Sequence, residues 1–432
     1  MNLSVNFQTQ ANLDSKRFSN DDLNNHFEKF KAVIDSEKVG FFQLTDHSEH
    51  LDKAQDMYEK HREKTHFIQV GIGGSALGPQ ALIDALKTNK KVKFSFMDNT
   101  DAEYISDVLS EIENPKKSLF YVVSKSGGTA ETIANFSIAR NFLRDNGIEE
   151  EQLKNHFVFC TDPSNGQLKE YADKHGYSCL QVPYDIGGRF SVFSHVGLFP
   201  ALFAGIQIDE LFEGANEIKA SLLNSNLEEN ILLQAGAHIM CLLEDKNVNQ
   251  TVLMPYSSKL KTLSHWFVQL WGESLGKVNS IGTNVGLTPI PAYGATDQHS
   301  QMQLFMEGPS DKVIFLLEVK NKSVDFNLGS GLEMDSAKKL ESFKLNQLIE
   351  AQFNGTLKAL KDQKKNVIKM SIDRNDPKHM GALILFFESL TALMGEYMEI
   401  DAFNQPGVEL GKKYAYEYLK NLNCPADKMV HN

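Results

Sequence analysis

The chain has 432 residues, of which 41% are hydrophobic, and a formal net charge of -12 at pH 7. A chain of this length is expected to fold into two or three domains, each with its own buried core. The negative charge argues against a nucleic acid or an anionic membrane as partner, because both are bound by clustered lysine and arginine side chains. A phosphate ligand would therefore have to be held by a local cluster of donor groups and not by overall positive charge.

The first 45 residues are polar and are predicted to form a helical N-terminal segment. No apolar run follows a basic stretch near the start, as it would in a secretory signal, so we expect a cytoplasmic protein. Four cysteines are spread along the chain without a metal-binding pattern, and we expect them to be reduced thiols. They are Cys160, Cys179, Cys241 and Cys424.

Short apolar runs alternate with helix-like stretches between residues 46 and 197. The runs are HFIQV at 66–70, VKFSFM at 92–97, LFYVVS at 119–124, HFVFC at 156–160 and SCLQV at 178–182. Their nearly continuous hydrophobicity is typical of parallel strands that are covered by helices on both faces. We therefore predict a doubly wound α/β domain over residues 46–197.

The first of these runs leads directly into a glycine-rich turn, residues 71–79, which opens a predicted helix. Backbone N–H groups in such a turn can point at an anion at the positive end of the helix. The turn also matches the G-x-G-x-x-A fingerprint of dinucleotide-binding proteins, and Asp98 stands where an acid that binds the ribose is expected. A nicotinamide-dependent dehydrogenase is therefore one alternative.

The third run ends in a cluster of hydroxyl, amine and glycine residues before another predicted helix. The cluster consists of Ser124, Lys125, Ser126, Gly127, Gly128 and Thr129. Its side-chain donors, backbone donors and helix dipole together favour a phosphate cradle. The alternative is an ordinary helix cap, but a cap needs only one hydroxyl. Two anion-binding turns on neighbouring strands favour a monophosphate over a dinucleotide.

A third glycine-containing turn, residues 185–191, places Arg189 directly after two glycines. The glycines let the backbone approach a ligand, and the arginine is always charged. The alternative is a surface turn whose arginine is solvated.

A second, looser set of apolar runs predicts a second doubly wound α/β domain over residues 198–380. The runs are TVLMPYS at 251–257, VIFLLEV at 313–319 and NVIKMSI at 366–372. Residues 336–360 are predicted to form one helix, because apolar residues recur there at a helical period. We expect those apolar residues, which include Leu340 and Phe343, to belong to the core.

Polar residues of this second domain are candidates for proton transfer. Gln269 and Glu273 lie in HWFVQLWGESLGK, whose aromatic residues predict partial burial. A partly buried carboxylate is a stronger base than a solvated one, although most glutamates lie in solvated salt bridges. His299 follows a loop rich in glycine and proline. A single histidine is more often structural than catalytic.

The last predicted segment, residues 381–432, is helical. Its most apolar stretch, residues 381–395, is predicted to be too short to cross a bilayer and is interrupted by Glu388, which favours a buried helix. A polar stretch follows, FNQPGVELGK at 403–412, and it contains Gln405 and Lys412.

These six polar segments, in this order, resemble those of the glucose-6-phosphate isomerase (phosphoglucose isomerase) family. The resemblance extends from Gly71 to Lys412, and GGRFS at 187–191 and GVELGK at 407–412 are its most specific parts. It implies two sugar-isomerase (SIS-type) domains packed together, with helical terminal segments of which the last returns to the active site. It also implies interconversion of glucose 6-phosphate and fructose 6-phosphate in glycolysis and gluconeogenesis, through ring opening and a cis-enediol, without cofactor or metal.

The resemblance implies a role for each matching residue. Glu273 would be the base, Arg189 would face the reacting carbons, and His299 and Lys412 would assist ring opening, with His299 contributed by the other subunit of a homodimer. The residues that would bind the substrate are Gly74, Ser75, Ser124, Lys125, Ser126, Thr129, Gln269 and Gln405.

Three questions stay open at this point. A non-catalytic sugar-phosphate sensor would keep the phosphate cradle, but it would not need Glu273, Arg189, His299 and Lys412 together. The chain also departs from the family at His195, just past the arginine turn, and the sequence does not decide whether this histidine touches the substrate. Nor does it decide whether mannose 6-phosphate, the C2 epimer, is a substrate.

Overall fold

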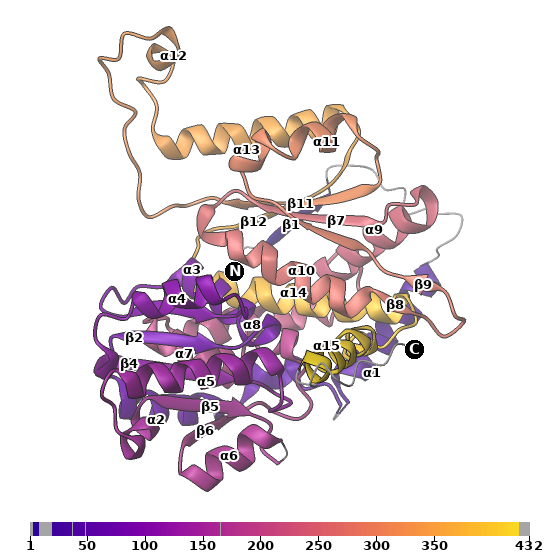
Figure 1. The fold of residues 1–432 in the computed structure, drawn as a ribbon. Coiled ribbons are helices and arrows are strands. Elements are labelled where there is room, and N and C mark those ends of the chain that lie inside the picture. The colour runs from indigo at the N-terminus through magenta and orange to yellow at the C-terminus, as the bar shows by residue number, and fades with distance from the viewer. Residues whose placement is uncertain (1–2, 8–19, 37, 48, 165, 423–432) are drawn as a thin grey trace.

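The computed structural model describes residues 3–7, 20–36, 38–47, 49–164 and 166–422. Within these residues two largely parallel sheets lie in separate layers, with helices packed between them and around them (Figure 1). The first sheet and its helices are drawn in purple to magenta, and the second sheet lies above them, with its strands from residues 250–372 in pink to orange. The predicted α/β class with two doubly wound sheets is confirmed.

The first sheet has five parallel strands in the order β3-β2-β4-β5-β6. The strands are β2 (His66–Val70), β3 (Lys93–Met97), β4 (Ser118–Val123), β5 (Phe157–Thr161) and β6 (Ser178–Gln181). Val70 pairs with Met97 on one side and with Val122 on the other. The turns after β2 and β4 therefore emerge side by side at the carboxyl edge of the sheet.

Helices cover both faces of this sheet, because successive residues of a strand point to opposite sides. Phe120 and Val122 pack in one layer with residues of α4, α5 and α6, whereas Leu119 and Tyr121 pack with residues of α2 and α7 in the other. The helices are α2 (Glu49–His61), α3 (Leu77–Leu86), α4 (Ala102–Ser110), α5 (Ala130–Asp145), α6 (Gln167–His175) and α7 (His195–Phe203).

The second sheet has five strands in the order β1-β12-β11-β7-β10, all parallel except β1. The strands are β1 (Ser4–Phe7), β7 (Gln250–Pro255), β10 (Thr288–Pro291), β11 (Lys312–Val319) and β12 (Asn366–Ile372). The edge strand β1 was not predicted, because only helix was expected before residue 46. A short hairpin of β8 (Lys277–Val278) and β9 (Asn284–Val285) lies apart from this sheet.

The remaining helices of the described chain lie around the second sheet, between the two sheets or at the surface (Figure 1). They are α1 (Asn20–Ile34), α8 (Ile208–Leu222), α9 (Ile231–Lys246), α10 (Lys261–Leu275), α11 (Met302–Glu307), α12 (Asp335–Lys338), α13 (Leu345–Asp362), α14 (Pro377–Tyr397) and α15 (Glu409–Leu422). Figure 1 shows α11 and α13 on the outer face of the sheet, with α10 and α14 on the inner face.

The two sheets repeat one connection order. The chain runs β2-α3-β3-α4-β4-α5-β5 in the first and β7-α10-β10-α11-β11-α13-β12 in the second, and the corresponding strands take the same places in each sheet. The equivalent helices α3 and α10 pack against each other. This contact brings the turn after β2 against α10, and so positions the site.

The single helix predicted for residues 336–360 is wrong. The chain forms α12, turns, and begins α13 at Leu345, because Asn327 forms a β-bridge with Lys344 and the amide of Leu345 bonds to the carbonyl of Phe326. Phe343 is 47% exposed and is not part of the core. Leu340 is exposed as well. Figure 1 shows this part of the chain projecting away from the second sheet.

The apolar stretch at residues 381–395 is part of a longer helix than predicted. At 21 residues α14 is long and apolar enough to cross a membrane by length and composition, and it is the one such helix in the described part of the chain. However, 89% of its most apolar window is buried inside the protein. The expected buried helix is therefore present, although shortness was the wrong reason for it. The predicted boundaries at 197 and 380 fall inside α7 and α14.

Candidate active site

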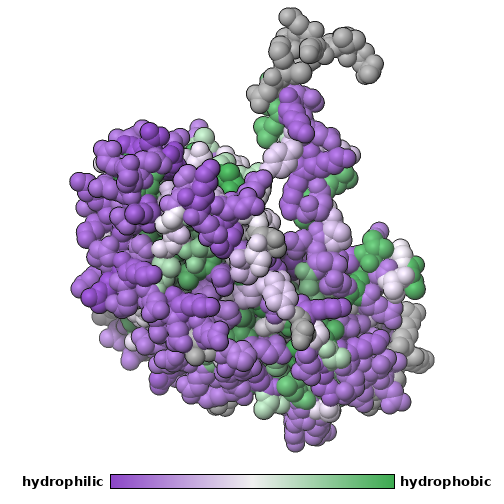
Figure 2. All heavy atoms as spheres, turned by 90° about the horizontal axis from the view of Figure 1, so that it is seen from below, coloured by the Kyte–Doolittle hydropathy of each residue, from purple (hydrophilic) through white to green (hydrophobic). Residues whose placement is uncertain are grey.

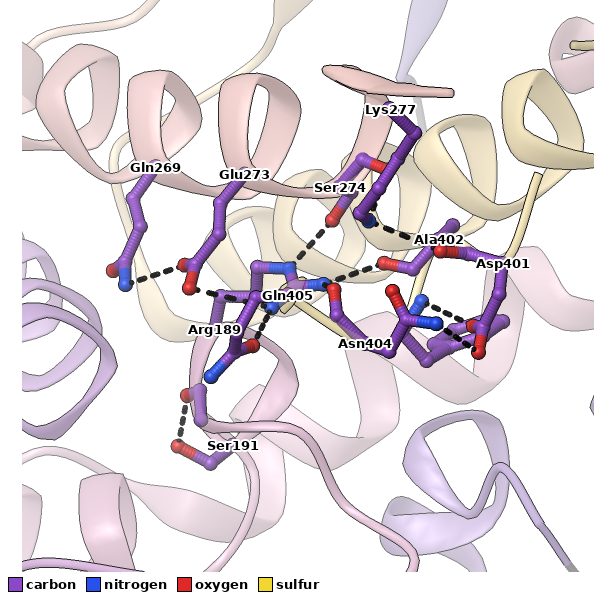
Figure 3. Close-up of polar contacts among 12 residues, drawn as sticks. Arg189, Ser191, Gln269, Glu273, Ser274, Lys277, Asp401, Ala402, Asn404 and Gln405 are labelled. Atoms are coloured by element: carbon purple, nitrogen blue, oxygen red, sulfur yellow. Dashed lines mark hydrogen bonds and ion pairs between the residues drawn. The ribbon is translucent and has the colours of Figure 1, made fainter. Parts of the chain in front are cut away.

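Arg189 is the most tightly held side chain of the predicted set. It lies in a short turn (η5, Gly188–Phe190), is 1% exposed, and makes four hydrogen bonds (Figure 3). Its Nε donates to Ser274 Oγ at 2.6 Å, Nη1 to Gln405 Oε1 at 2.6 Å, and Nη2 to the carbonyls of Ala402 at 2.6 Å and Asn404 at 2.9 Å. A planar guanidinium with this many partners has a fixed position and orientation.

Glu273 faces this guanidinium from α10. Its Oε1 lies 3.6 Å from Nη1 of Arg189, and its Oε2 accepts a hydrogen bond of 3.0 Å from Nε2 of Gln269 (Figure 3). Gln269 and Glu273 are neighbours because residues four apart share one face of a helix. The Glu273 side chain remains 23% exposed, so a small ligand can reach the carboxylate. Burial lowers the pKa of Arg189, and the negative charge of Glu273 opposes this effect.

The turn after β2 packs directly against the arginine turn. A Cβ atom added to Gly74 would lie 2.3 Å from the carbonyl carbon of Gly188, which no side chain tolerates. A Cβ on the neighbouring Gly73, whose φ is +59°, would lie 2.8 Å from Nε2 of Gln269. These glycines therefore allow two backbone turns to meet, and Ser75 ends the same short turn (η2, Gly73–Ser75).

The dinucleotide alternative gains no support from Asp98. Its Oδ1 accepts a hydrogen bond of 3.0 Å from the hydroxyl of Tyr104 on α4. The carboxylate that would bind a ribose thus already has a partner within the chain.

The predicted phosphate cradle lies at the amino end of α5. The hydroxyl oxygens of Ser124 and Thr129 lie 2.9 Å apart, and the hydroxyl oxygen of Ser126 lies 3.4 Å from that of Thr129. Gly127, with φ +65°, lets the chain turn sharply between them. Three hydroxyls therefore gather where the helix dipole favours an anion.

Lys125 extends from this cradle to the loop before the arginine turn. Its Nζ donates to the carbonyls of Tyr184 at 2.9 Å and Ile186 at 2.7 Å. Burial lowers the pKa of this amine. The ammonium group thus links the cradle to the loop that leads into Arg189.

His299 and Lys412 are not joined to this cluster. His299 is exposed and ends a short turn (η7, Thr296–His299), and no hydrogen bond or ion pair among the described residues links it to Glu273 or Arg189. Lys412 lies on α15, where its side chain is 57% exposed and pairs with Glu409 at 2.8 Å. No residue of α15 is buried, and Figure 2 shows this helix projecting from the rest of the molecule.

His195 lies behind the site. It begins α7, is buried, and its Nδ1 lies 2.6 Å from the carbonyl of Gln181. Its ring packs edge-on against His50 at 5.0 Å between centroids, and burial lowers its pKa to about 4. The buried imidazole is therefore neutral at pH 7 and is held by a backbone carbonyl and a second histidine ring.

Some of the groups that hold Arg189 could not be assigned from the sequence. Ser274 stands next to Glu273 in the chain, but its neighbourhood does not reveal that it faces an arginine. The carbonyls of Ala402 and Asn404 carry no side-chain signal at all. No cluster of three or more His, Cys, Asp or Glu residues that could hold a metal ion occurs among the residues described. Cys160, Cys179 and Cys241 are free thiols, and Cys424 lies outside the described residues.

The chain is similar to known proteins over most of its length. A family model described as phosphoglucose isomerase matches residues 31–432. The glucose-6-phosphate isomerase of Carboxydothermus hydrogenoformans is 37% identical in an alignment that covers 94% of this chain and 92% of that protein. A glucose-6-phosphate isomerase of Thermus thermophilus is also 37% identical, with 87% of this chain and 88% of that protein covered.

Solved structures share the fold. A protein of Thermus thermophilus described as hypothetical has a TM-score of 0.86 and 36% identity, with 92% of this chain and 94% of that chain covered. A glucose-6-phosphate isomerase of Chlamydia trachomatis has a TM-score of 0.80, with 98% of this chain and 90% of that chain covered. Its identity of 23% shows likeness of fold alone.

Proposed function

The chain belongs to the phosphoglucose isomerase family, and we propose that Arg189, Glu273, Gln269 and Gln405 form the centre at which it isomerises its substrate. It is an aldose-ketose isomerase that interconverts glucose 6-phosphate and fructose 6-phosphate, a step of glycolysis and gluconeogenesis. The observation that carries the site assignment is the 3.6 Å separation of a partly accessible carboxylate from a buried, fixed guanidinium.

In the proposed mechanism Glu273 moves one proton between neighbouring carbons. It takes the C2 proton of the open-chain aldose while the C1 carbonyl oxygen gains a proton, and a cis-enediol forms. Return of the proton to C1, with loss of the proton from the C2 hydroxyl, yields the ketose. No net oxidation occurs. The charge of Arg189 stabilises the enediolate oxygens, and Gln269 orients the carboxylate.

We assign the substrate phosphate to the cradle at the amino end of α5. Ser124, Ser126 and Thr129 supply hydroxyl donors, and the first turn of α5 supplies the positive end of a helix. Ser75 and Gly74 line the neighbouring turn. Lys125, which binds the loop before Arg189, couples the cradle to the reacting end of the sugar.

Ring opening is assigned to His299 and Lys412, with His299 acting in the site of a second subunit. Its exposure and its lack of a link to Glu273 within the described residues support this arrangement, which makes the active form a homodimer. Mixing inactive E273Q and H299A homodimers tests it. Subunit exchange would create one site with both residues intact and restore activity, whereas no recovery after exchange would contradict a shared site.

We propose that the chain has the predicted two α/β domains, 46–197 and 198–380, between terminal segments 1–45 and 381–432, although the boundaries at 197 and 380 cut through α7 and α14. The support for this division is that the parallel strands fall into two separate sheets, one from each domain. A cytoplasmic location is expected for an enzyme of glycolysis.

The deciding experiment is to incubate the purified protein with fructose 6-phosphate and to measure the glucose 6-phosphate formed. A parallel reaction with mannose 6-phosphate shows whether the C2 epimer is accepted. Lack of product from fructose 6-phosphate would overturn the function. If the E273Q substitution leaves product formation unchanged, only the assignment of the site is overturned.

A further inference from the structure

Lys277 bridges two segments that meet at Arg189. It opens β8 just after α10 and is half-buried. Its Nζ donates to the carbonyl of Ser274 at 2.9 Å and to the carbonyl of Asp401 at 3.0 Å (Figure 3). Ser274 is in the last turn of α10, the helix that carries Glu273, and a lysine there is favoured by the helix dipole.

The second carbonyl belongs to the segment that anchors the arginine. Residues 401–405 supply two carbonyls and one amide oxygen to the Arg189 guanidinium. Among the described residues, the hydrogen bonds of the Asp401 side chain stay inside this segment, with Phe403 and Asn404. Among the residues described, the hydrogen bonds that tie 401–405 to other parts of the chain come from Arg189 and Lys277. Aromatic packing of Phe403 adds an apolar contact.

We propose that Lys277 is a positioning residue for the isomerisation, because it ties the segment that anchors Arg189 to the helix that carries Glu273. The lysine sets the relative position of the guanidinium and the carboxylate without touching the substrate. This inference rests on the proposed function of the Arg189 and Glu273 pair.

The charges around Lys277 are those of the same cluster. Burial lowers its pKa to about 8, and the positive charge of Arg189 acts in the same direction, while Asp401 and Glu273 oppose it. The ammonium therefore lies within the electric field of the reacting groups. Burial and the charge of Arg189 disfavour the charged form of Lys277, and its two carbonyl partners stabilise that form.

The test compares K277M with K277R, which keeps a charged donor. K277M should lower kcat for fructose 6-phosphate by about tenfold or more with a small change in KM, because a displaced arginine weakens transition-state stabilisation. K277R should recover much of this loss. K365M is the matched control, since Lys365 is a buried lysine that likewise donates to a carbonyl, that of Gly308, away from the cluster.

The binding of two substrate analogues distinguishes a positioning role of Lys277 from general damage to the protein. An aldonic acid 5-phosphate carries a carboxylate in place of the enediolate, whereas a hexitol 6-phosphate has no charge at the reacting carbons. K277M should weaken binding of the acid by about tenfold and of the hexitol phosphate by less than about threefold. Equal weakening of both ligands, or a wild-type kcat in K277M, would overturn the proposal.

A second variant and the wild-type protein distinguish the remaining outcomes. If K277M does not fold, K277Q, which is shorter and uncharged, makes the same two-ligand comparison, and an equal effect on both ligands there overturns the proposal as well. A wild-type protein that does not convert fructose 6-phosphate would overturn the proposed function itself. An active wild type with unaltered K277M overturns only the role of Lys277.

Discussion

The guanidinium Nη1 of Arg189 lies 3.6 Å from Oε1 of Glu273, although the two residues belong to different halves of the fold. Arg189 follows the first sheet and Glu273 lies on the first helix after β7 of the second. The pair can form only because the turn after β2, the arginine turn and α10 pack together. Substitutions at this junction should therefore separate binding, chemistry and stability.

Replacing Glu273 with glutamine should abolish proton transfer and leave sugar-phosphate binding nearly intact. We expect kcat to fall by at least about a thousandfold, because an amide cannot act as the base. Steady-state kinetics and direct binding of fructose 6-phosphate measure the two effects. E150Q is the control, since Glu150 pairs with Arg140 on the surface and should retain full activity. An E273Q protein with normal turnover would refute the assignment.

Removing the cradle hydroxyls should act on binding more than on chemistry. The double variant S124A/T129V deletes the 2.9 Å hydroxyl contact and two donors at the α5 terminus. We expect KM to rise by about tenfold or more with a smaller change in kcat, since the phosphate is distant from the reacting carbons. T262V, which removes a hydroxyl bonded to Asp84, is the control. An unchanged KM would place the phosphate elsewhere.

Alanine at Gly74 should displace the arginine turn. Its Cβ would lie 2.3 Å from a backbone carbon of Gly188, and backbone cannot yield as a flexible side chain does. We expect a fall in both melting temperature and kcat, with stability reduced by about 1–3 kcal/mol. G355A on α13, where nothing lies within 4 Å of the added atom, should be neutral or stabilising. A G74A protein that matches G355A would contradict the close packing.

Acidification should destabilise the protein in part through His195, one of four described histidines whose pKa burial lowers to about 4. Burial lowers its pKa from 6.5 to about 4, so between these values the unfolded chain binds more protons than the folded one. Its contribution to stability is complete above pH 6.5 and is lost as the pH falls towards 4. Denaturant unfolding of the wild type and of a variant without this imidazole, at several pH values, isolates its part of the slope.

The variant H195N removes the titrating group and keeps a donor for the carbonyl of Gln181. Its stability should depend less on pH in that window, and its kcat at neutral pH should stay within about threefold of wild type. A large loss of kcat without loss of stability would show that His195 takes part in the reaction.

Much of the fold was predictable because its signals are local. The apolar runs at 66–70 and 366–372 coincide with β2 and β12, since a strand buried on both faces must be apolar along its length. The helix predicted for residues 336–360 failed for the converse reason. Its apolar period was correct for α13, but pairing between Asn327 and Lys344, which are distant in sequence, interrupts it.

The site, like the fold, was predictable from the sequence only in part. Residue types and their spacing were enough to make the arginine turn and the cradle at 124–129 candidates, because glycine turns and hydroxyl clusters are visible in a single segment. The role of Glu273 was implied only by the resemblance to the family. The partners of Arg189 depend on how the two layers pack, and backbone carbonyls such as that of Ala402 leave no trace in residue identity. Only the folded chain brings Lys277 to Asp401, since their contact joins the end of α10 to a segment far along the sequence.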